Sequence, residues 1–173
     1  MKKGQFTFFI IKPEVLKAKK EEEILSIIRE NGFLIRNLKR VVPTEGIIKE
    51  HYQHLIDKPF FPDLLKYMTS GEVIFGILQK RNAIEEWRKL IGDTDPSKAE
   101  EGTIRNKYGY KEENSIYNTV HGSDSPQSFY REIEIWYGKK YICEGCGKFV
   151  EEDDFYQGLP LCGECGDFIW YGI

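Results

Sequence analysis

Hydrophobic residues recur along the first 137 residues with two periods, one typical of strands and one typical of helices. Runs rich in β-branched and aromatic residues predict strands at 6–11, 33–42, 71–80 and 116–120. Apolar residues at helical spacing predict helices at 21–31, 44–55, 60–68, 82–92 and 125–137. We expect Asn82 to cap one of these helices, and Ser125 with Pro126 to begin another. Residues 93–115 are polar with little periodicity, which predicts a long loop.

The order of these elements is strand-helix-strand-helix-helix-strand-helix-strand-helix. Without its extra helices, this order is the split βαβ arrangement. The sequence therefore predicts an α+β fold of the ferredoxin-like type, in which helices cover one face of an antiparallel sheet.

Composition excludes several classes of protein. The chain has 173 residues, of which 40% are hydrophobic and 31% charged, and these are values of a globular protein. A net charge of −3 gives no basic face for nucleic acid. The longest purely apolar run is Phe8 to Ile11, far below the roughly 18 residues of a membrane span. We therefore expect a cytoplasmic protein with no membrane contact and no specific nucleic-acid partner.

All four cysteines lie in the last 31 residues, in two CxxCG sequences separated by 15 residues. They are Cys143, Cys146, Cys162 and Cys165. A segment of 35 residues (139–173) seldom folds without a disulfide, a bound metal or another stabilising link. Four thiolates suit a tetrahedral, structural Zn²⁺. We expect a domain at 1–138 and a zinc-ribbon-like module at 139–173. Iron in a rubredoxin-like site and a redox dithiol are the alternatives.

Two further features of this tail are open to prediction. The residues between the two cysteine pairs are typical of a β-hairpin that turns near Gly158. The apolar end, 168–173, either packs against the rest of the chain or docks onto a neighbouring subunit.

His121 is the strongest candidate for chemistry in the first 138 residues. It is followed by the start of a helix, where free N–H groups favour an anion. A histidine oriented by a carboxylate is a nucleophile at neutral pH, and Glu132 in the same helix is a candidate partner. The alternative is that His121 only packs at the end of a strand. Cations and exposed rings that would suit a nucleoside triphosphate stand elsewhere in the chain: Lys12, Arg88, Arg105 and Phe60.

Several segments together resemble the nucleoside diphosphate kinase family. They are TFFIIKP (7–13), HYQHLIDKPFFPDLLKYMTSGEV (51–73), RKLIGDTDP (88–96), EEGTIR (100–105) and NTVHGSDSPQSFYREI (118–133). The resemblance covers about residues 5–137, in the family's order and with nearly its spacing. It implies transfer of a phosphate from a nucleoside triphosphate to a nucleoside diphosphate through a phosphohistidine.

The resemblance also implies a role for each matching residue. His121 would be the nucleophile, with Glu132 on its other ring nitrogen and Ser123 assisting that carboxylate. Mg²⁺ would bridge the phosphates, with Asp124 as a possible outer contact. The remaining implied residues bind the nucleotide: Lys12 and Asn118 at the sugar 3′-hydroxyl, with Lys12 also at the transferred phosphate; Arg88, Thr94 and Arg105 at the β- and γ-phosphates; His51 and Tyr52 beside the nucleophile; Phe60 and Leu64 at the base.

The chain departs from the family pattern at two places. Residues 15–23 read VLKAKKEEE where the family has an Arg-Gly stretch, and Asn106-Lys107-Tyr108 replaces Gly-Asp-Phe in a loop that is about three residues longer. Both places shape subunit contacts in the family, which tends to form hexamers or tetramers. We therefore expect a homo-oligomer of undetermined size. The alternative function is a nucleotide-binding adaptor that uses the cysteine module to recruit a partner.

Overall fold

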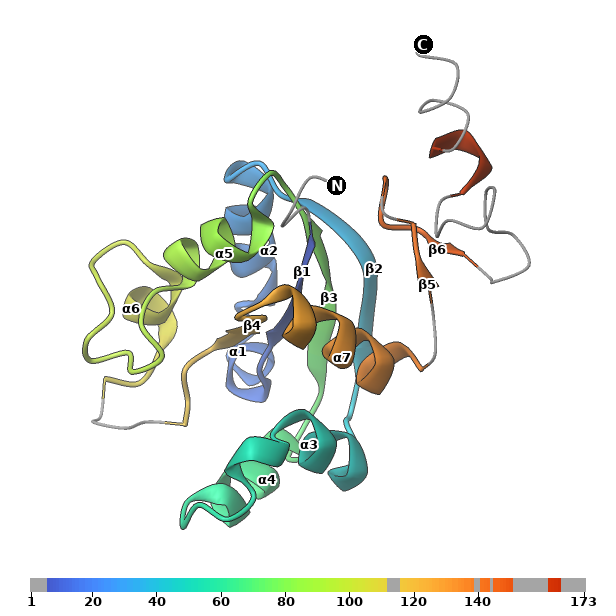
Figure 1. Ribbon diagram of the computed structural model, residues 1–173. Coiled ribbons are helices and arrows are strands. Elements are labelled where there is room, and N and C mark those ends of the chain that lie inside the picture. Colours follow the sequence, from blue (N-terminus) through green and yellow to red (C-terminus); the bar gives the residue numbers. More distant parts are fainter. Residues whose placement is uncertain (1–5, 112–115, 139–140, 144, 151–161, 166–173) are drawn as a thin grey trace.

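The centre of the fold is a four-stranded antiparallel sheet with the order β2-β3-β1-β4 (Figure 1). The computed structural model describes residues 6–111, 116–138, 141–143, 145–150 and 162–165. The strands are β1 (Phe6–Ile11), β2 (Leu34–Val41), β3 (Val73–Gln79) and β4 (Val120–Gly122). This order confirms the predicted antiparallel, ferredoxin-like sheet.

Helices pack on both faces of this sheet, so the prediction of helices on one face was wrong. Phe8 and Ile10 of β1 lie in a core with α3 (Glu45–His51), α4 (Phe61–Met68) and α7 (Pro126–Tyr137). Phe9 and Ile11 lie in a second core with α2 (Glu21–Glu30) and α5 (Ala83–Ile91). All six residues of β1 are buried, and such an unbroken apolar run is typical of a strand covered on both sides.

Most helix boundaries agree with the predictions. Oγ of Ser125 accepts the N–H of Ser128 at 3.1 Å and caps α7, with Pro126 in the first position. Thr44 caps α3 in the same way, and a 3₁₀ turn (Gln53–Leu55) continues that segment. Asn82 stands at the N-cap of α5 but makes no side-chain capping hydrogen bond, because its backbone is left-handed with φ 55°.

Three predicted segments differ in detail. Two short helices were not predicted, α1 (Pro13–Lys17) and α6 (Ile104–Tyr108), and α6 interrupts the long loop expected at 93–115. The strand expected at 116–120 begins only at Val120, because Thr119 has φ 66° and cannot continue a strand. A bulge between Arg36 and Lys39 interrupts β2, with Asn37 at φ 51°.

The described part of the cysteine-containing tail lies against the sheet. The strands β5 (Tyr141–Ile142) and β6 (Phe149–Val150) form a small hairpin around the first cysteine pair. Nδ2 of Asn37 donates to the carbonyl of Gly147 at 3.1 Å, and Nε2 of Gln79 donates to that of Gly145 at 3.2 Å. The predicted turn near Gly158 and the apolar end at 168–173 lie outside the described residues.

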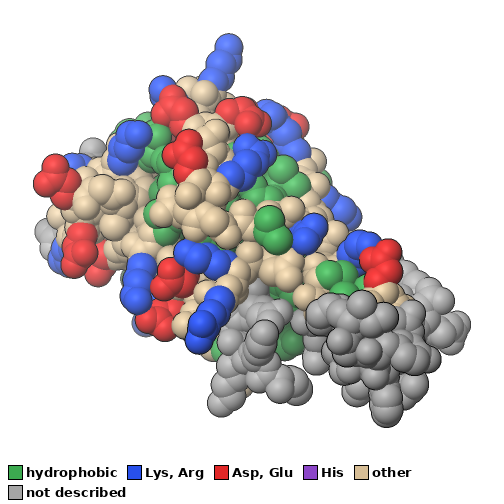
Figure 2. Space-filling model, turned by 90° about the horizontal axis from the view of Figure 1, so that it is seen from above, with side chains coloured by type: hydrophobic (Ala, Val, Ile, Leu, Met, Phe, Trp, Pro, Cys, Tyr) green, Lys and Arg blue, Asp and Glu red, His purple; other side chains and the backbone are tan. Residues whose placement is uncertain are grey.

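The surface mixes charges of both signs. On the face shown in Figure 2, lysine and arginine side chains alternate with aspartate and glutamate, without a large patch of one sign. This mixture agrees with the small net charge of −3. In the part of the chain that the structure describes, no helix is long and apolar enough to cross a membrane.

Candidate active site and cysteine cluster

His121 lies in β4, an edge strand of the sheet, where it pairs with Ile10 of β1. Its Nε2 is 2.8 Å from Oε1 of Glu132, a buried carboxylate on α7. Oγ of Ser123 donates to Oε2 of the same carboxylate at 2.6 Å and accepts the N–H of Phe8 at 3.1 Å. The carboxylate is therefore fixed by its own partner, and Nδ1 is the ring nitrogen of His121 left with a free lone pair.

The segment around His121 is anchored to α5 by Trp87. Nε1 of Trp87 donates to the carbonyl of His121 at 3.2 Å. A Cβ on Gly122 would lie 2.3 Å from Cδ1 of Trp87, so a residue with a side chain does not fit there. The glycine thus lets the backbone next to His121 lie close to α5, the helix that also carries Arg88.

Two buried polar groups without a hydrogen-bond partner among the described residues flank His121. The ring of His51 packs edge-on against the ring of His121, with centroids 4.4 Å apart, and that of Tyr52 lies 6.3 Å away. The unpartnered atoms are Nε2 of His51 and the hydroxyl of Tyr52. Nε1–H of Trp136 donates to Nδ1 of His51 at 3.1 Å, so the neutral ring carries its proton on Nε2.

Burial keeps both groups in the form that donates a hydrogen bond. It lowers the pKa of His51 well below the ordinary value, and the neighbouring charges of His121 and Arg131 add to this effect. Burial also raises the pKa of the Tyr52 hydroxyl, with a further contribution from Glu132. At neutral pH, His51 is uncharged and Tyr52 keeps its proton.

Lys12, Asn118 and Arg105 form a buried polar group beside this site. Nζ of Lys12 donates to Oδ1 of Asn118 at 2.6 Å, and Nδ2 of Asn118 donates to the carbonyl of Thr94 at 2.9 Å. Burial lowers the pKa of Lys12 to about 8, although Glu14 raises it; Arg105 lowers it further. Lys12 is therefore a cation at neutral pH, but its pKa lies only slightly above that pH.

Arg105 is held by three backbone carbonyls. Its Nε, Nη1 and Nη2 donate to the carbonyls of Asn118, Gly92 and Val120, at 3.3, 2.9 and 2.9 Å. Burial lowers the pKa of Arg105 to about 10, so it stays charged at neutral pH. These contacts occupy three of the five N–H donors of the guanidinium and leave two for another acceptor.

The other predicted nucleotide residues have different exposures. Arg88 and Thr94 are exposed, and Arg88 is near enough to lower the pKa of Arg105 and of Asp124. Phe60 is 44% exposed at the start of α4, whereas Leu64 is 4% exposed and belongs to the core beneath it. An exposed ring on a buried support is a suitable surface for stacking a base.

Two groups of side chains among the described residues could hold a metal ion by proximity: His51–His121–Glu132 and the four cysteines. The first group is unsuited to a metal, because Nε2 of His51 carries a proton and Nε2 of His121 faces Glu132. Neither group is the set of oxygen ligands that Mg²⁺ prefers. A Mg²⁺ ion here would be held mainly by phosphate oxygens and water.

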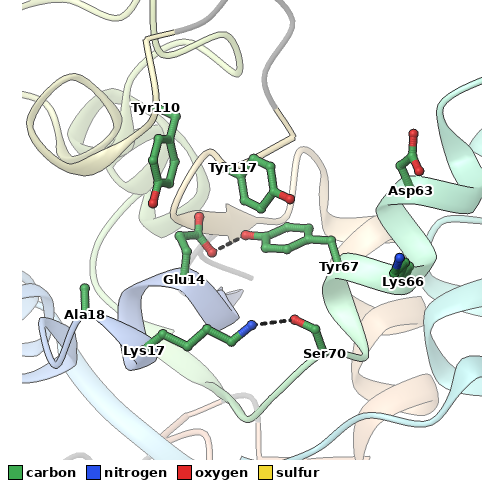
Figure 3. A pocket seen from close by; sticks show the side chains of 9 residues that line it. All are labelled: Glu14, Lys17, Ala18, Asp63, Lys66, Tyr67, Ser70, Tyr110 and Tyr117. Carbon is green, nitrogen blue, oxygen red and sulfur yellow. Dashed lines mark hydrogen bonds between the residues drawn. The ribbon is translucent and has the colours of Figure 1, made fainter.

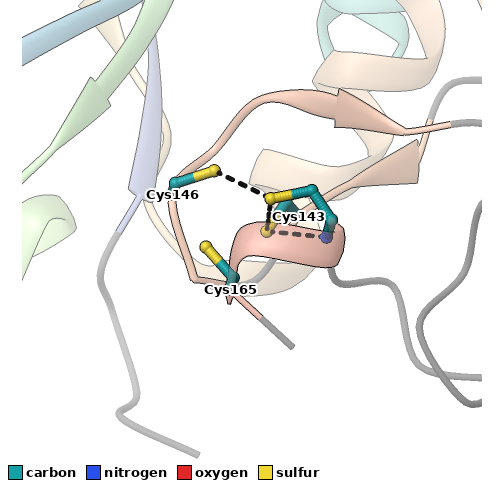
Figure 4. Close-up of side chains that lie close together, drawn as sticks. Cys143, Cys146 and Cys165 are labelled. Carbon is teal, nitrogen blue, oxygen red and sulfur yellow. Dashed lines mark hydrogen bonds between the residues drawn. The ribbon is translucent and has the colours of Figure 1, made fainter. Parts of the chain in front are cut away.

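The four cysteine sulfurs converge (Figure 4) and all lie within 4.8 Å of one another. Sγ of Cys162 is 3.7 Å from Sγ of Cys143 and 3.7 Å from that of Cys146. A disulfide needs about 2.05 Å, and all four cysteines are free. Burial raises the pKa of Cys143, but N–H groups of Cys162, Cys146 and Gly145 outweigh it and bring the pKa to about 7.

Sequence reasoning missed two of the residues that organise the site. Trp136 fixes the ring of His51, but in the sequence it is one more apolar position on α7. Glu14 accepts the N–H of Thr119 at 2.8 Å, two residues before His121. The signal for Glu14 was its place directly after Lys12-Pro13, although its partner is more than 100 positions away in the chain.

Comparison with known proteins agrees with this geometry. The family model described as nucleoside diphosphate kinase matches residues 5–142, which include every candidate nucleotide residue and none of the cysteines. A nucleoside diphosphate kinase of Streptococcus thermophilus is 42% identical over 136 residues, which are 78% of this chain and 99% of that protein. One from Streptococcus agalactiae is 44% identical over 133 residues, 76% of this chain and 96% of that protein.

Solved structures give the same result for the fold. The nucleoside diphosphate kinase of Encephalitozoon cuniculi superposes with a TM-score of 0.72 at 34% identity, over 78% of this chain and 90% of that one. That of Aquifex aeolicus has a TM-score of 0.69 at 32% identity, over 76% of this chain and 93% of that one. The chain therefore belongs to the nucleoside diphosphate kinase family.

Proposed function

We propose that this chain is an active nucleoside diphosphate kinase and that His121 carries the phosphate between two nucleotides. The observation that supports this most is the contact of His121 Nε2 with Glu132, which leaves Nδ1 free beside two buried donors. Family membership alone does not assign these roles, and the geometry supports them residue by residue.

The proposed reaction has two half-steps at one site. The lone pair of His121 Nδ1 forms a bond to the γ-phosphorus, while the bond from phosphorus to the β–γ bridging oxygen breaks and the diphosphate leaves with that electron pair. A β-phosphate oxygen of a second diphosphate then attacks the phosphorus, and the N–P bond breaks. Glu132 stabilises the ring by accepting from Nε2–H throughout.

The surrounding residues position the phosphates and neutralise their charge, which is most of what phosphoryl transfer needs. Lys12, Arg88 and Arg105 supply positive charge, and Thr94 and Asn118 supply polar contacts at the phosphates and the sugar. The unpartnered donors of His51 and Tyr52 would bind oxygens of the phosphate in transfer. Phe60 would stack on the base, above Leu64, and Mg²⁺ would arrive with the nucleotide.

Labelling with ATP radioactive in the γ-phosphate tests this proposal directly. The full-length chain with Mg²⁺ should gain acid-labile phosphate and pass it to added diphosphate. The variant His121→Ala should lose labelling while its circular dichroism stays unchanged. The matched control is His54→Ala, because His54 is exposed on the 3₁₀ turn. Labelling that survives in His121→Ala contradicts the proposal, and so does a wild-type chain that takes no label, as an adaptor without activity would.

We also propose that the four cysteines bind one structural Zn²⁺. Zinc–sulfur bonds of about 2.3 Å in a tetrahedron place the sulfurs about 3.8 Å apart, close to the two observed separations of 3.7 Å. The free thiols also fit the reducing cytoplasm that we propose as the location of the chain. With four protein ligands, the site has no open position for catalysis.

Elemental analysis of the purified chain tests the zinc proposal. We expect one zinc per chain, and loss of most of it in Cys143→Ser. The control Ser26→Ala changes a partly buried position of α2, far from the cysteines in the sequence. Iron in place of zinc, visible by its absorption, would contradict zinc, and an absence of any metal would contradict the site.

We further propose that the chain forms a homo-oligomer. The edge strand β2 leaves large apolar side chains exposed, with Leu34 at 55% and Leu38 at 44%. Exposed apolar side chains on an unpaired strand favour contact with another copy. Light scattering should give a mass of several chains, and a monomer at micromolar concentration would contradict this.

A further inference from the structure

The backbone turn directly before His121 is in an unusual conformation. Thr119 has a left-handed backbone with φ 66°, and the N–H of Val120 folds back onto the carbonyl of Asn118 at 2.7 Å. A β-branched residue seldom adopts this conformation, which persists only where the surroundings enforce it. Something in the fold must therefore hold Thr119 in place.

Glu14 is the side chain that binds the N–H of Thr119. Its Oε1 accepts that N–H at 2.8 Å, and its Oε2 accepts the hydroxyl of Tyr67 (Figure 3). The N–H of Lys12 donates to the carbonyl of Thr119 at 2.8 Å from the other side. Since Thr119 is fully buried, its N–H would lose its partner if Glu14 were removed.

The residues on either side of this turn belong to the candidate site. Asn118 binds Nζ of Lys12, and Val120 leads directly into His121. Arg105 binds the carbonyls of Asn118 and Val120, whereas the N–H of Thr119 between them is bound by Glu14. A change of backbone at Thr119 would therefore move the sugar and phosphate contacts and the nucleophile relative to each other.

Glu14 also connects the turn to two helices. It lies in α1, and Tyr67 lies in α4, whose first turn follows Phe60. Both oxygens of the carboxylate point inward to Thr119 and Tyr67, although Glu14 also lines a cleft of about 740 Å³. These inward contacts favour a role in positioning over ligand binding in the cleft.

We propose that Glu14 is a positioning residue that holds the left-handed turn at Thr119, and thereby aligns Asn118 and His121 for phosphate transfer. This inference rests on the proposed function. It also assigns Tyr67 the task of fixing the carboxylate of Glu14 from α4.

Three variants separate this role from a general loss of structure. Glu14→Ala removes the acceptor and should lower the rate of His121 labelling at saturating ATP about ten- to a hundredfold, as misplacement by about 1 Å can. Glu14→Gln keeps an oxygen that accepts the N–H of Thr119, so it should keep most of the rate. Glu14→Ala with Thr119→Gly should recover much of the loss, because glycine adopts this φ without strain.

The variants of Glu14 lower the pKa of Lys12, because Glu14 raises it from its position nearby. The assay is therefore best run near pH 6.5, well below the wild-type pKa of about 8, so that Lys12 stays protonated in every variant. Tyr67→Phe is a milder variant that should fold and lose a smaller part of the rate. Equal labelling of folded Glu14→Ala and wild type would overturn the inference, and so would a loss that neither glutamine nor glycine reduces. A wild-type chain that takes no label would instead contradict the proposed function.

Discussion

Nε2 of His121 lies 2.8 Å from Oε1 of Glu132, and this contact determines which nitrogen of the ring is free to react. The carboxylate is buried and is itself bound by Ser123. A carboxylate fixed in this way holds the imidazole in one tautomer and one orientation, and it stabilises the ring when the other nitrogen forms a bond.

Removal of this carboxylate should slow the reaction without unfolding the chain. In Glu132→Ala, we expect the rate of phosphate transfer to fall about a hundredfold or more, the usual range for the loss of such assistance. Rapid-quench labelling of His121 measures this rate. Glu134→Ala is the matched control, since Glu134 is an exposed position of the same helix. Equal rates in the two variants would show that Glu132 does not assist His121.

The activity should depend on pH through Lys12. Burial brings its pKa to about 8, so its ammonium is lost as the pH rises through that value. Because the proposed role needs a cation, kcat/KM should fall on the alkaline side with a midpoint near the same pH. The charged and aromatic groups facing Lys12 are Glu14, Arg105 and the ring of Tyr67, and Glu14 raises the pKa.

Two variants check this assignment. Glu14→Gln removes a negative charge, which lowers the pKa of Lys12 and should move the alkaline limb to lower pH. Lys12→Arg carries a group that stays charged, so the limb should disappear from whatever activity remains. An alkaline limb that is unchanged in both variants would assign it to a different group.

Ser123 should contribute to stability as well as to the site. Its hydroxyl accepts the N–H of Phe8 and donates to Glu132, and all three groups are buried. Ser123→Ala leaves a buried donor and a carboxylate oxygen unpaired, which costs about 1–3 kcal/mol. Calorimetry should therefore show a Tm lower by several degrees. The control Ser128→Ala alters a partly buried serine at the first turn of α7, and a larger loss there would contradict the expectation.

If the four cysteines hold zinc as proposed, its removal should lower the stability of the tail and loosen its contact with the sheet. Structural zinc contributes on the order of 10 kcal/mol to the folding of small modules. Treatment with a strong chelator should therefore make amides around Cys143 to Val150 exchange faster with deuterium. The nucleotide site is built from other elements, so phosphate transfer should be largely retained.

The contact between tail and sheet can be weakened on its own. Gln79→Ala removes the hydrogen bond to Gly145 but none of the four sulfur ligands. We expect this variant to keep its zinc and to show a smaller increase in exchange than the chelated wild type. Exchange that is unaffected by the chelator would indicate that the tail folds without metal.

Local patterns in the sequence were sufficient for most of the fold. Ser125 caps its helix as expected, and the helix expected from residue 44 begins directly after Thr44, because capping depends on residues three positions apart. The second layer of helices was not predicted, because the order of elements alone suggested helices on one face, although the unbroken apolar run of β1 is typical of a strand covered on both sides. The left-handed backbone of Thr119 was not predictable, since its contacts with Glu14 and Lys12 come from a distant part of the sequence.

The candidate site likewise has one part that the sequence predicts and one part that it does not. His121 and Glu132 lie only 11 positions apart, at the start and inside one predicted helix, which indicated a shared site, whereas Ser123 was expected there from the family resemblance. The contacts of Glu14 with Thr119 and of Trp136 with His51 join segments 85 to 105 positions apart. No periodicity connects such pairs, and they emerge only when the sheet brings the segments together.

The strand β1 separates the two proposed sites of this chain. Gln79, which binds the cysteine-containing turn, pairs with Phe6 at one end, whereas His121 pairs with Ile10 near the other. At about 3.4 Å per residue, these positions are roughly 14 Å apart. Cobalt substituted at the cysteines would thus give a coloured reporter of unfolding, placed beyond direct contact with the nucleotide. Its absorbance could follow the integrity of the sheet while the enzyme turns over.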